Sequence, residues 1–221
     1  MQKLIFKRIL IPLFTIVIVV SGTVGAPKVS QHLQEFKNSK SAHSKVQIIR
    51  SLVKEQALIS TNASEMESAA KIISSGLNDR NALVVQEAIF AAGNFRNKNV
   101  APELYELYKN GYKAFPGNQS IIKQKIIRAY GKIGGNETEH LFIEELNSKT
   151  ICYETVLILS SLLENGKCSP KIVESVAALR NAIEYILKGV EDSPENSIRY
   201  SQHRTILALA NSLITKNTQT R

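Results

Sequence analysis

Three cations and three tyrosines have the residue types and the spacing to recognise another molecule. The cations recur at i, i+3 and i+7 of one predicted helix and therefore share a face: Lys125, Arg128 and Lys132. The tyrosines are spaced by three and four residues on the preceding predicted helix: Tyr105, Tyr108 and Tyr112. Such groups bind a protein partner by charge and by aromatic contact. The alternatives are that the cations only solvate an outer helix face and that the tyrosines pack in the core.

Charge is unevenly distributed around this cationic face. Residues 81–134 hold eight Lys and Arg against three Glu, whereas residues 135–170 hold six Glu against two Lys. The whole chain has a formal net charge of +9. The functional interpretation is a basic groove beside an acidic one, which favours another protein, acidic in part, as the partner. Nucleic-acid binding is not expected, because it would require a denser basic patch with aromatic residues for stacking.

The sequence contains none of the catalytic motifs for which we searched. It has no His-Glu-x-x-His, no Gly-x-Ser-x-Gly and no glycine-rich phosphate loop. We therefore expect neither enzymatic activity nor a cofactor nor a metal ion. The alternative is a helical enzyme whose site is assembled from residues distant in the sequence.

Cys152 and Cys168 are the only cysteines in the chain. If residues 152–164 are helical, the ends of that helix lie about 18 Å apart, at 1.5 Å per residue. The four residues that follow can reach back only about 13 Å, whereas a disulfide needs Cα atoms within about 7 Å. We therefore expect both thiols to be free.

The elements that carry these residues come from one pattern that occurs twice. The copies are DRNALVVQEAIFAAGNF at Asp79–Phe95 and NQSIIKQKIIRAYGKIGG at Asn118–Gly135, offset by 38 residues. Apolar residues recur at helical spacing in each copy, and a glycine stands late in the helix, Gly93 or Gly131. That glycine is tolerable where a neighbouring helix comes close or where the helix ends nearby. A second, shorter amphipathic stretch follows each copy, so the pattern predicts stacked helix pairs.

The doubled pattern resembles the HEAT repeat, in particular the bacterial form whose first helix runs D-x-(D/N)-P-x-V-R-x-x-A-x-x-A-L-G-x-(L/I)-G. Matching positions are Asp79, Asn81, Val84, Ala88, Ala91 and Gly93 in the first copy, and Ile122, Lys123, Ala129, Gly131, Ile133 and Gly134 in the second. The departures are Ala82 for the proline, Val85 for the arginine and Ile126 for the first alanine. The resemblance implies an all-α, right-handed solenoid of antiparallel helix pairs, and it is almost silent on function.

Residues 1–26 are typical of a secretory signal peptide. Lys3, Lys7 and Arg8 precede a 12-residue apolar run at Ile9–Val20, and small residues follow. The run is shorter than the about 20 residues that a transmembrane helix needs. We therefore expect export to the periplasm or the extracellular space. The alternative is an uncleaved inner-membrane anchor facing the periplasm, which would be the only contact with a membrane.

Three segments are predicted after the signal peptide. Residues 27–44 are polar and basic, which predicts a flexible lead-in. Helical periodicity over residues 45–215 predicts one HEAT-like domain of about nine helices. The polar residues 216–221 are predicted to form a disordered tail. This organisation favours an exported, non-enzymatic module that binds a protein on its concave face, either as a scaffold or assembly factor or as an immunity or inhibitor protein.

Overall fold

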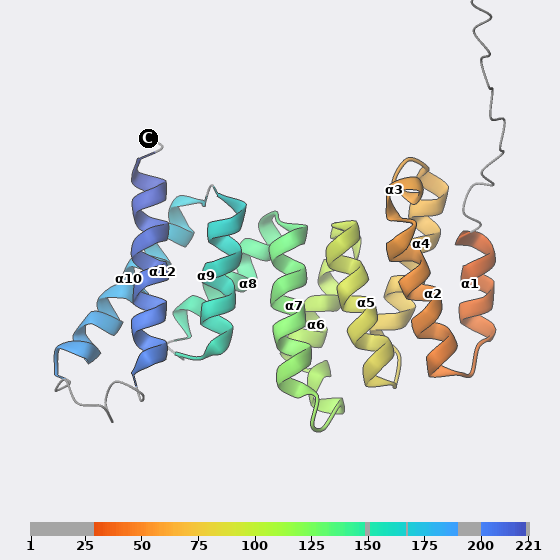
Figure 1. Cartoon of the computed structure of the whole chain (residues 1–221), viewed down its shortest axis with the longest axis horizontal. Coiled ribbons are helices and arrows are strands. Elements are labelled where there is room, and N and C mark those ends of the chain that lie inside the picture. Colours follow the sequence, from red (N-terminus) through yellow and green to blue (C-terminus); the bar gives the residue numbers. More distant parts are fainter. Residues whose placement is uncertain (1–28, 149–150, 167, 190–199, 220–221) are drawn as a thin grey trace, which may run out of the picture.

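The computed structural model describes residues 29–148, 151–166, 168–189 and 200–219, and every regular element in these ranges is helical. The fold is therefore all-α, as the periodicity predicts (Figure 1). The α-helices are α1 (Val29–Asn38), α2 (Ala42–Lys54), α3 (Gln56–Ile59), α4 (Ala63–Leu77), α5 (Ala82–Phe95), α6 (Ala101–Lys109), α7 (Gln119–Ile133), α8 (Asn136–Asn147), α9 (Tyr153–Asn165), α10 (Pro170–Lys188) and α12 (Ser201–Thr218). Two short 3-10 helices, η1 (Lys98–Val100) and η2 (Gly111–Ala114), flank α6.

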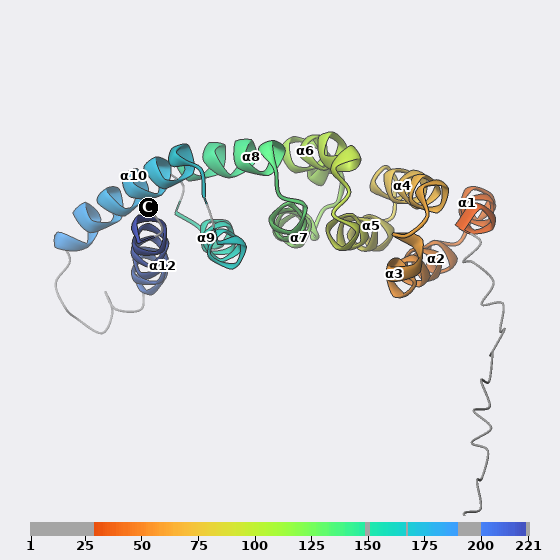
Figure 2. The same ribbon diagram turned by 90° about the horizontal axis from the view of Figure 1, so that it is seen from above.

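The helices form two rows along an arch (Figure 2). The inner row lies on the concave side and consists of α2, α5, α7, α9 and α12, each packed against the next. The outer row consists of α4, α6, α8 and α10, with α1 packed against α4 at one end. The chain passes from an inner helix to an outer helix and back, so the apolar core lies between the two rows.

The first copy of the sequence pattern begins α5 through two side-chain caps. The Asp79 carboxylate accepts a hydrogen bond from the backbone N–H of Asn81 at 2.8 Å, and the Asn81 side-chain oxygen accepts one from the N–H of Leu83 at 2.9 Å. These bonds satisfy donors that a helix start leaves free. The apolar period then points into the core, where Val84 and Ala88 are fully buried.

Small residues let the inner helices approach each other closely. A Cβ atom on Gly93 of α5 would lie 2.9 Å from the Cα atom of Ala129 on α7. At the next pair of inner helices, a Cβ atom on Gly131 of α7 would lie 2.7 Å from Oγ of Ser161 on α9. Both distances are too short for a real Cβ contact, so the two glycines stand where a neighbouring helix comes close.

Composition predicts a flexible lead-in over residues 27–44, but within this segment Val29–Asn38 form α1. Val29 and Phe36 of this helix are buried. A carboxylate oxygen of Glu65 on α4 accepts a hydrogen bond from the backbone N–H of Val29 at 2.8 Å. The prediction was wrong because α1 has too few apolar residues to show a helical period in the sequence. The packing of α1 against α4 buries these few residues, and Glu65 of α4 caps the start of α1.

The predicted disordered tail, residues 216–221, is also wrong over its first half, since α12 continues to Thr218. The side chain of Asn217 accepts a hydrogen bond from the backbone N–H of Cys168 at 3.0 Å, which fastens the last turn of α12 to the start of α10. The polar composition predicted a disordered tail, but the hydrogen bond between Asn217 and Cys168 holds the last turn of α12 in place.

The start of the helical domain and the number of helices differ from expectation as well. Helix α2 begins at Ala42 and not at Lys45, because Ser41 caps it. The described residues contain eleven α-helices where about nine were expected. The difference comes from α1, which was not predicted, and from the four-residue α3, which was predicted as the end of α2.

Residues 1–26, for which a signal peptide or anchor is predicted, lie outside the described residues. Within the described ranges no helix is both long enough and apolar enough to cross a membrane. Export and anchoring therefore stay predictions.

Candidate functional site

One side of the inner row is left uncovered, and it defines the candidate site. Helix α7 packs against α5 and α9 on its two flanks and against α6 and α8 of the outer row. Its exposed residues therefore face the concave side of the arch (Figure 2). The same holds for α5, which lies between α2 and α7 and packs on α4, and for α9, which lies between α7 and α12 and packs on α8.

Positions on this uncovered side correspond through the 38-residue offset of the sequence, although only Leu83 and Ile121 have similar side chains. All of them are exposed or half-buried. The equivalent pairs on α5 and α7 are Leu83 and Ile121, Glu87 and Lys125, Phe90 and Arg128, and Asn94 and Lys132. Tyr153 occupies the first position of α9 and is 46% exposed. We call these nine residues the inner stripe.

The inner stripe contains a row of apolar side chains that crosses three helices. Leu83, Ile121 and Tyr153 each lie in the first turn of their helix and are 64%, 46% and 46% exposed. The helices run parallel, because Gln86 near the start of α5 donates to Asn118 just before α7 at 3.3 Å, while the glycine contacts join their later turns. The three side chains therefore lie at the same end of the row. Contiguous exposed apolar groups of this kind mark binding surfaces.

The predicted cations lie one to three turns further along α7, beside this apolar row. Lys132 donates a hydrogen bond to the side-chain oxygen of Asn94 at 3.1 Å, and its ammonium lies 5.3 Å from the ring centroid of Phe90 on α5. Lys125 and Arg128 have no acidic partner among the described residues. Their charges are therefore free to attract an anion.

A hollow of about 370 Å³ on the same side joins three helices of the inner row. Its lining comes from α2, α5 and α7, and consists of Arg50, Val53, Lys54, Glu87, Phe90 and Lys125. Glu87 is already neutralised, since one of its oxygens accepts a hydrogen bond from Arg50 at 2.7 Å. This hydrogen bond also raises the pKa of Arg50. Lys54 and Lys125 then leave the hollow with an excess of positive charge.

The structure separates the predicted tyrosines from the predicted cations. Tyr105 and Tyr108 belong to α6 in the outer row, and Tyr112 follows in η2. Tyr108 is only 2% exposed, which contradicts its predicted role in contact with a partner. Burial raises its pKa, with a further contribution from Glu145. The spacing from Tyr105 to Tyr108 was correctly helical, but it marks the side of α6 that packs inside the molecule. Helix α6 ends at Lys109, so Tyr112 lies beyond the helix that was predicted to carry all three tyrosines.

Tyr105 and Tyr112 are half-buried and also have internal contacts. The Tyr105 hydroxyl donates to the carboxylate of Glu144 on α8 at 2.9 Å, and Lys109 forms an ion pair with the same carboxylate. The ammonium of Lys123 lies 4.4 Å from the ring centroid of Tyr112. These tyrosines therefore join neighbouring helices.

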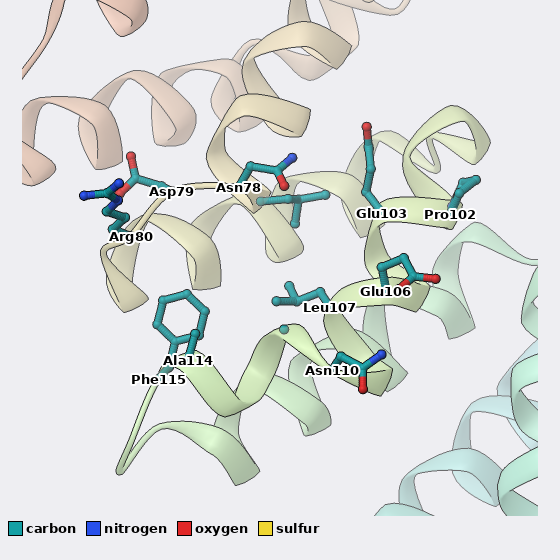
Figure 3. Close-up of a pocket in the computed structure, with 12 residues that line it drawn as sticks. Asn78, Asp79, Arg80, Pro102, Glu103, Glu106, Leu107, Asn110, Ala114 and Phe115 are labelled. Carbon is teal, nitrogen blue, oxygen red and sulfur yellow. The ribbon is translucent and has the colours of Figure 1, made fainter.

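A second hollow, of about 710 Å³, lies on the outer row between α4, α6 and η2 (Figure 3). Leu77, Leu107 and Phe115 give it apolar walls. Glu103 also lines it, with one oxygen accepting from the Ser74 hydroxyl at 2.8 Å and the other buried without a hydrogen-bond partner among the described residues. None of the six predicted site residues lines this hollow, so the inner stripe remains the candidate site.

Both cysteines are free thiols in the structure. Helix α9 begins directly after Cys152 and continues to Asn165, so its length holds the two residues apart as the geometric argument requires. Burial raises the pKa of the Cys168 thiol. Among the described residues no cluster of three His, Cys, Asp or Glu side chains could hold a metal ion.

Sequence analysis missed the apolar members of the inner stripe. Leu83, Phe90 and Ile121 do not fall on the core period of α5 and α7, which Val84 and Ile122 represent. That departure was visible in the sequence, because a soluble helix is expected to place polar residues on the side opposite its core. Tyr153 could not be assigned, since it stands at a helix start outside the repeated pattern.

No known family matches the chain, and neither a curated protein nor a solved structure gives a match.

Proposed function

We propose that the chain is an exported, non-enzymatic interaction module that binds an acidic partner protein along the inner stripe. The fold proposed for it is a right-handed HEAT-like α-solenoid, in which each stacked helix pair contributes one equivalent set of surface residues. Leu83 and Ile121 support this view, because these exposed apolar residues stand at positions of α5 and α7 that the 38-residue offset relates. The signal-like composition of residues 1–26 supports export.

The observation that carries the proposal is the exposure of large apolar side chains beside free cations. Seven large apolar residues are exposed among those described, and four of them belong to the inner stripe. These four are Leu83, Phe90, Ile121 and Tyr153. A partner that covers them gains about 25 cal/mol for each Å² of apolar surface removed from water. The free charges of Lys125 and Arg128 add selectivity for an acidic partner.

Binding is favoured over catalysis by the chemistry of the stripe. Its described side chains are apolar groups, amides and cations, and its one carboxylate, Glu87, is paired with Arg50. Neither a nucleophile with an adjacent base nor a pair of free carboxylates is present in it. We therefore assign it recognition without chemistry.

Site-specific photocrosslinking in the native cell envelope tests this proposal. The crosslinking amino acid p-benzoylphenylalanine replaces Phe90 or Ile121 in the stripe, and it replaces Glu106, an exposed residue of outer-row α6, as the matched control. We expect one dominant adduct at both stripe positions and none at Glu106. The same adduct at all three positions, or none at the stripe, would contradict binding at the stripe.

Mass spectrometry of the adduct also separates the two binding roles. A structural envelope protein as the crosslinked partner would indicate a scaffold or assembly factor, whereas a toxin or an enzyme whose activity falls on binding would indicate an inhibitor. Peptides from residues 1–26 in the same spectra would report that the N-terminal segment is retained.

A further inference from the structure

We infer that the partner meets the inner stripe with an extended, acidic segment that carries an apolar side chain at every third residue. This inference rests on the proposed function, because it specifies which kind of protein segment the stripe accepts. It follows from the spacing of the apolar row, from the width of that row and from the charges beside it.

The spacing of the row matches an extended chain. Packed helices lie about 8 to 10 Å apart, and the glycine contacts of Gly93 and Gly131 keep the inner helices close. Leu83, Ile121 and Tyr153 each lie in the first turn of one of three successive inner helices, so a chain that crosses the row meets one of them at each helix. An extended chain advances about 3.1 to 3.3 Å per residue, so three residues span about one helix spacing.

The direction of the side chains in an extended chain agrees with a spacing of three residues per inner helix. A polyproline II segment has three residues per turn, so every third side chain points the same way. Leucines at i, i+3 and i+6 of such a segment would all face the row of Leu83, Ile121 and Tyr153. The intervening residues would point away from the row, toward solvent or along the inner helices.

The width of the row disfavours a helical partner. Each inner helix offers one apolar side chain to the row, and the next positions on the uncovered side of α7 are Gln124 and Lys125. Phe90, the other exposed apolar residue of the stripe on α5, lies two turns beyond Leu83, and the Lys132 ammonium lies 5.3 Å from its ring centroid. A partner helix presents an apolar stripe at least about 100° wide, with neighbours at i+3 and i+4. Part of that stripe would lie against Gln124 and Lys125, whereas a single extended chain fits a row one residue wide.

Charge sets the chemistry of the remaining residues of the segment. Lys125 and Arg128 follow Ile121 by one and two turns and have no acidic partner among the described residues. Carboxylates in the segment would neutralise them. A second copy that met the stripe with its own stripe would be repelled by the same cations, and the acidic residues of its α8 and α9 are helical and not extended. The N-terminal segment carries only basic charges, at Lys3, Lys7 and Arg8. The occupant is therefore a segment of another, acidic protein.

Fluorescence anisotropy with labelled synthetic peptides and the purified full-length protein tests the inference. The probe is a peptide of four Leu-Glu-Pro repeats. One control has the same composition with its four leucines placed together, a second has Lys in place of Glu, and a third is an acidic helical peptide with leucine at every seventh residue. We expect the probe to bind at least tenfold more tightly than each control. Equal or tighter binding of any control would overturn the inference.

Two protein variants locate the binding. Ile121→Ser removes the centre of the apolar row, and Lys125→Glu reverses a free cation, so each should weaken binding of the probe by about tenfold or more. Glu106→Ser on the outer row is the matched control and should leave it unchanged. Unaltered binding to both stripe variants would overturn the inference, and circular dichroism of each variant reports whether it is folded.

The two experiments fail in distinguishable ways. Crosslinking from Phe90 and Ile121 together with no binding of the probe would leave the proposed function standing and overturn only the extended acidic segment. Absence of both would contradict the binding surface itself.

Discussion

The inner row and the middle of the outer row are held together by different kinds of contact. In the inner row, glycine and alanine or serine bring helices almost to backbone contact, at Gly93 with Ala129 and at Gly131 with Ser161. Between α6 and α8 of the outer row, longer polar side chains span the gap, as Tyr105 does with Glu144. Helices spaced closely on one side and more widely on the other produce an arch. The close glycine contacts accordingly lie on the concave side of the arch and the Tyr105–Glu144 bridge on its convex side (Figure 2).

The difference between the two rows also shows which contacts contribute to stability and which surface remains for binding. Packing in the inner row cannot change without moving a helix, whereas the polar bridges of the outer row face water in part. On the uncovered side of the inner row Lys132 contacts Asn94 and Arg50 pairs with Glu87, whereas Leu83, Ile121, Lys125 and Arg128 are left available for a partner. Four substitutions test this division, beginning with the one expected to have the largest effect.

Gly93→Leu should have the largest effect of the four, a loss of about 3 kcal/mol, because even the first side-chain carbon would lie 2.9 Å from the backbone of Ala129. Urea denaturation followed by circular dichroism measures the change. Glu106→Leu, at an exposed position of α6, is the matched control and should stay within about 0.5 kcal/mol of the wild type. A loss below about 1 kcal/mol for Gly93→Leu would show that α5 and α7 have room to separate.

Tyr130→Phe should cost about 1 to 2 kcal/mol, because it removes a contact that joins the two rows. The Tyr130 hydroxyl is fully buried on α7 and donates to the backbone oxygen of Ala101, at the start of α6, at 2.6 Å. The matched control is Tyr105→Phe, whose hydroxyl binds a carboxylate that is partly exposed. Denaturation curves that rank the two variants in the opposite order would contradict the central role of the buried contact.

Glu144→Gln should have a smaller and pH-dependent effect. The hydrogen bond from Lys109, assisted by that from Tyr105, lowers the pKa of the Glu144 carboxyl below its ordinary 4.5. A lowered pKa in the folded state stabilises the protein above the unfolded pKa, and the gain is lost as the pH falls through the folded value. Because the pair is partly exposed, we expect a difference of at most about 1 kcal/mol at pH 7.

The pH dependence is the measurement that identifies the cause. Urea midpoints of wild type and Glu144→Gln should differ at pH 7 and converge as the pH falls below 4.5. Glu67→Gln is the control. Glu67 pairs with Lys71 on the exposed surface of α4, so this ion pair lies within one helix and does not join two helices. A difference for Glu144→Gln that stays constant with pH would contradict the assigned ion pair.

How far the sequence predicts this structure depends on whether a residue's role is local. The buried period from Val84 onward follows from local spacing, and the structure contains it. Helix α1 was missed because Phe36 and Val29 become buried only against other helices. Local composition does not contain that information.

The candidate site was predicted in part for the same reason. Lys125, Arg128 and Lys132 were placed on one exposed face because their spacing within one helix is sufficient to do so. For Tyr108 the same argument predicted which residues share its side of the helix. It could not predict whether that side is buried, because burial depends on the helices packed around α6. Exposure is a property of the whole arrangement, so spacing can group residues without deciding whether they face water.

The smallest effect on stability is expected at the inner stripe, and two adjacent isoleucines make the comparison. Ile121 is 46% exposed, whereas Ile122 is fully buried between the rows. Ile121→Ser should therefore change the free energy of unfolding by less than about 0.5 kcal/mol, while Ile122→Ser should cost about 3 kcal/mol or more through lost packing and a buried hydroxyl. The same Ile121→Ser protein is expected to lose crosslinking from Phe90. Loss of crosslinking without loss of stability would assign Ile121 to binding and not to folding. Equal destabilisation by the two serines would mean that Ile121 belongs to the core after all.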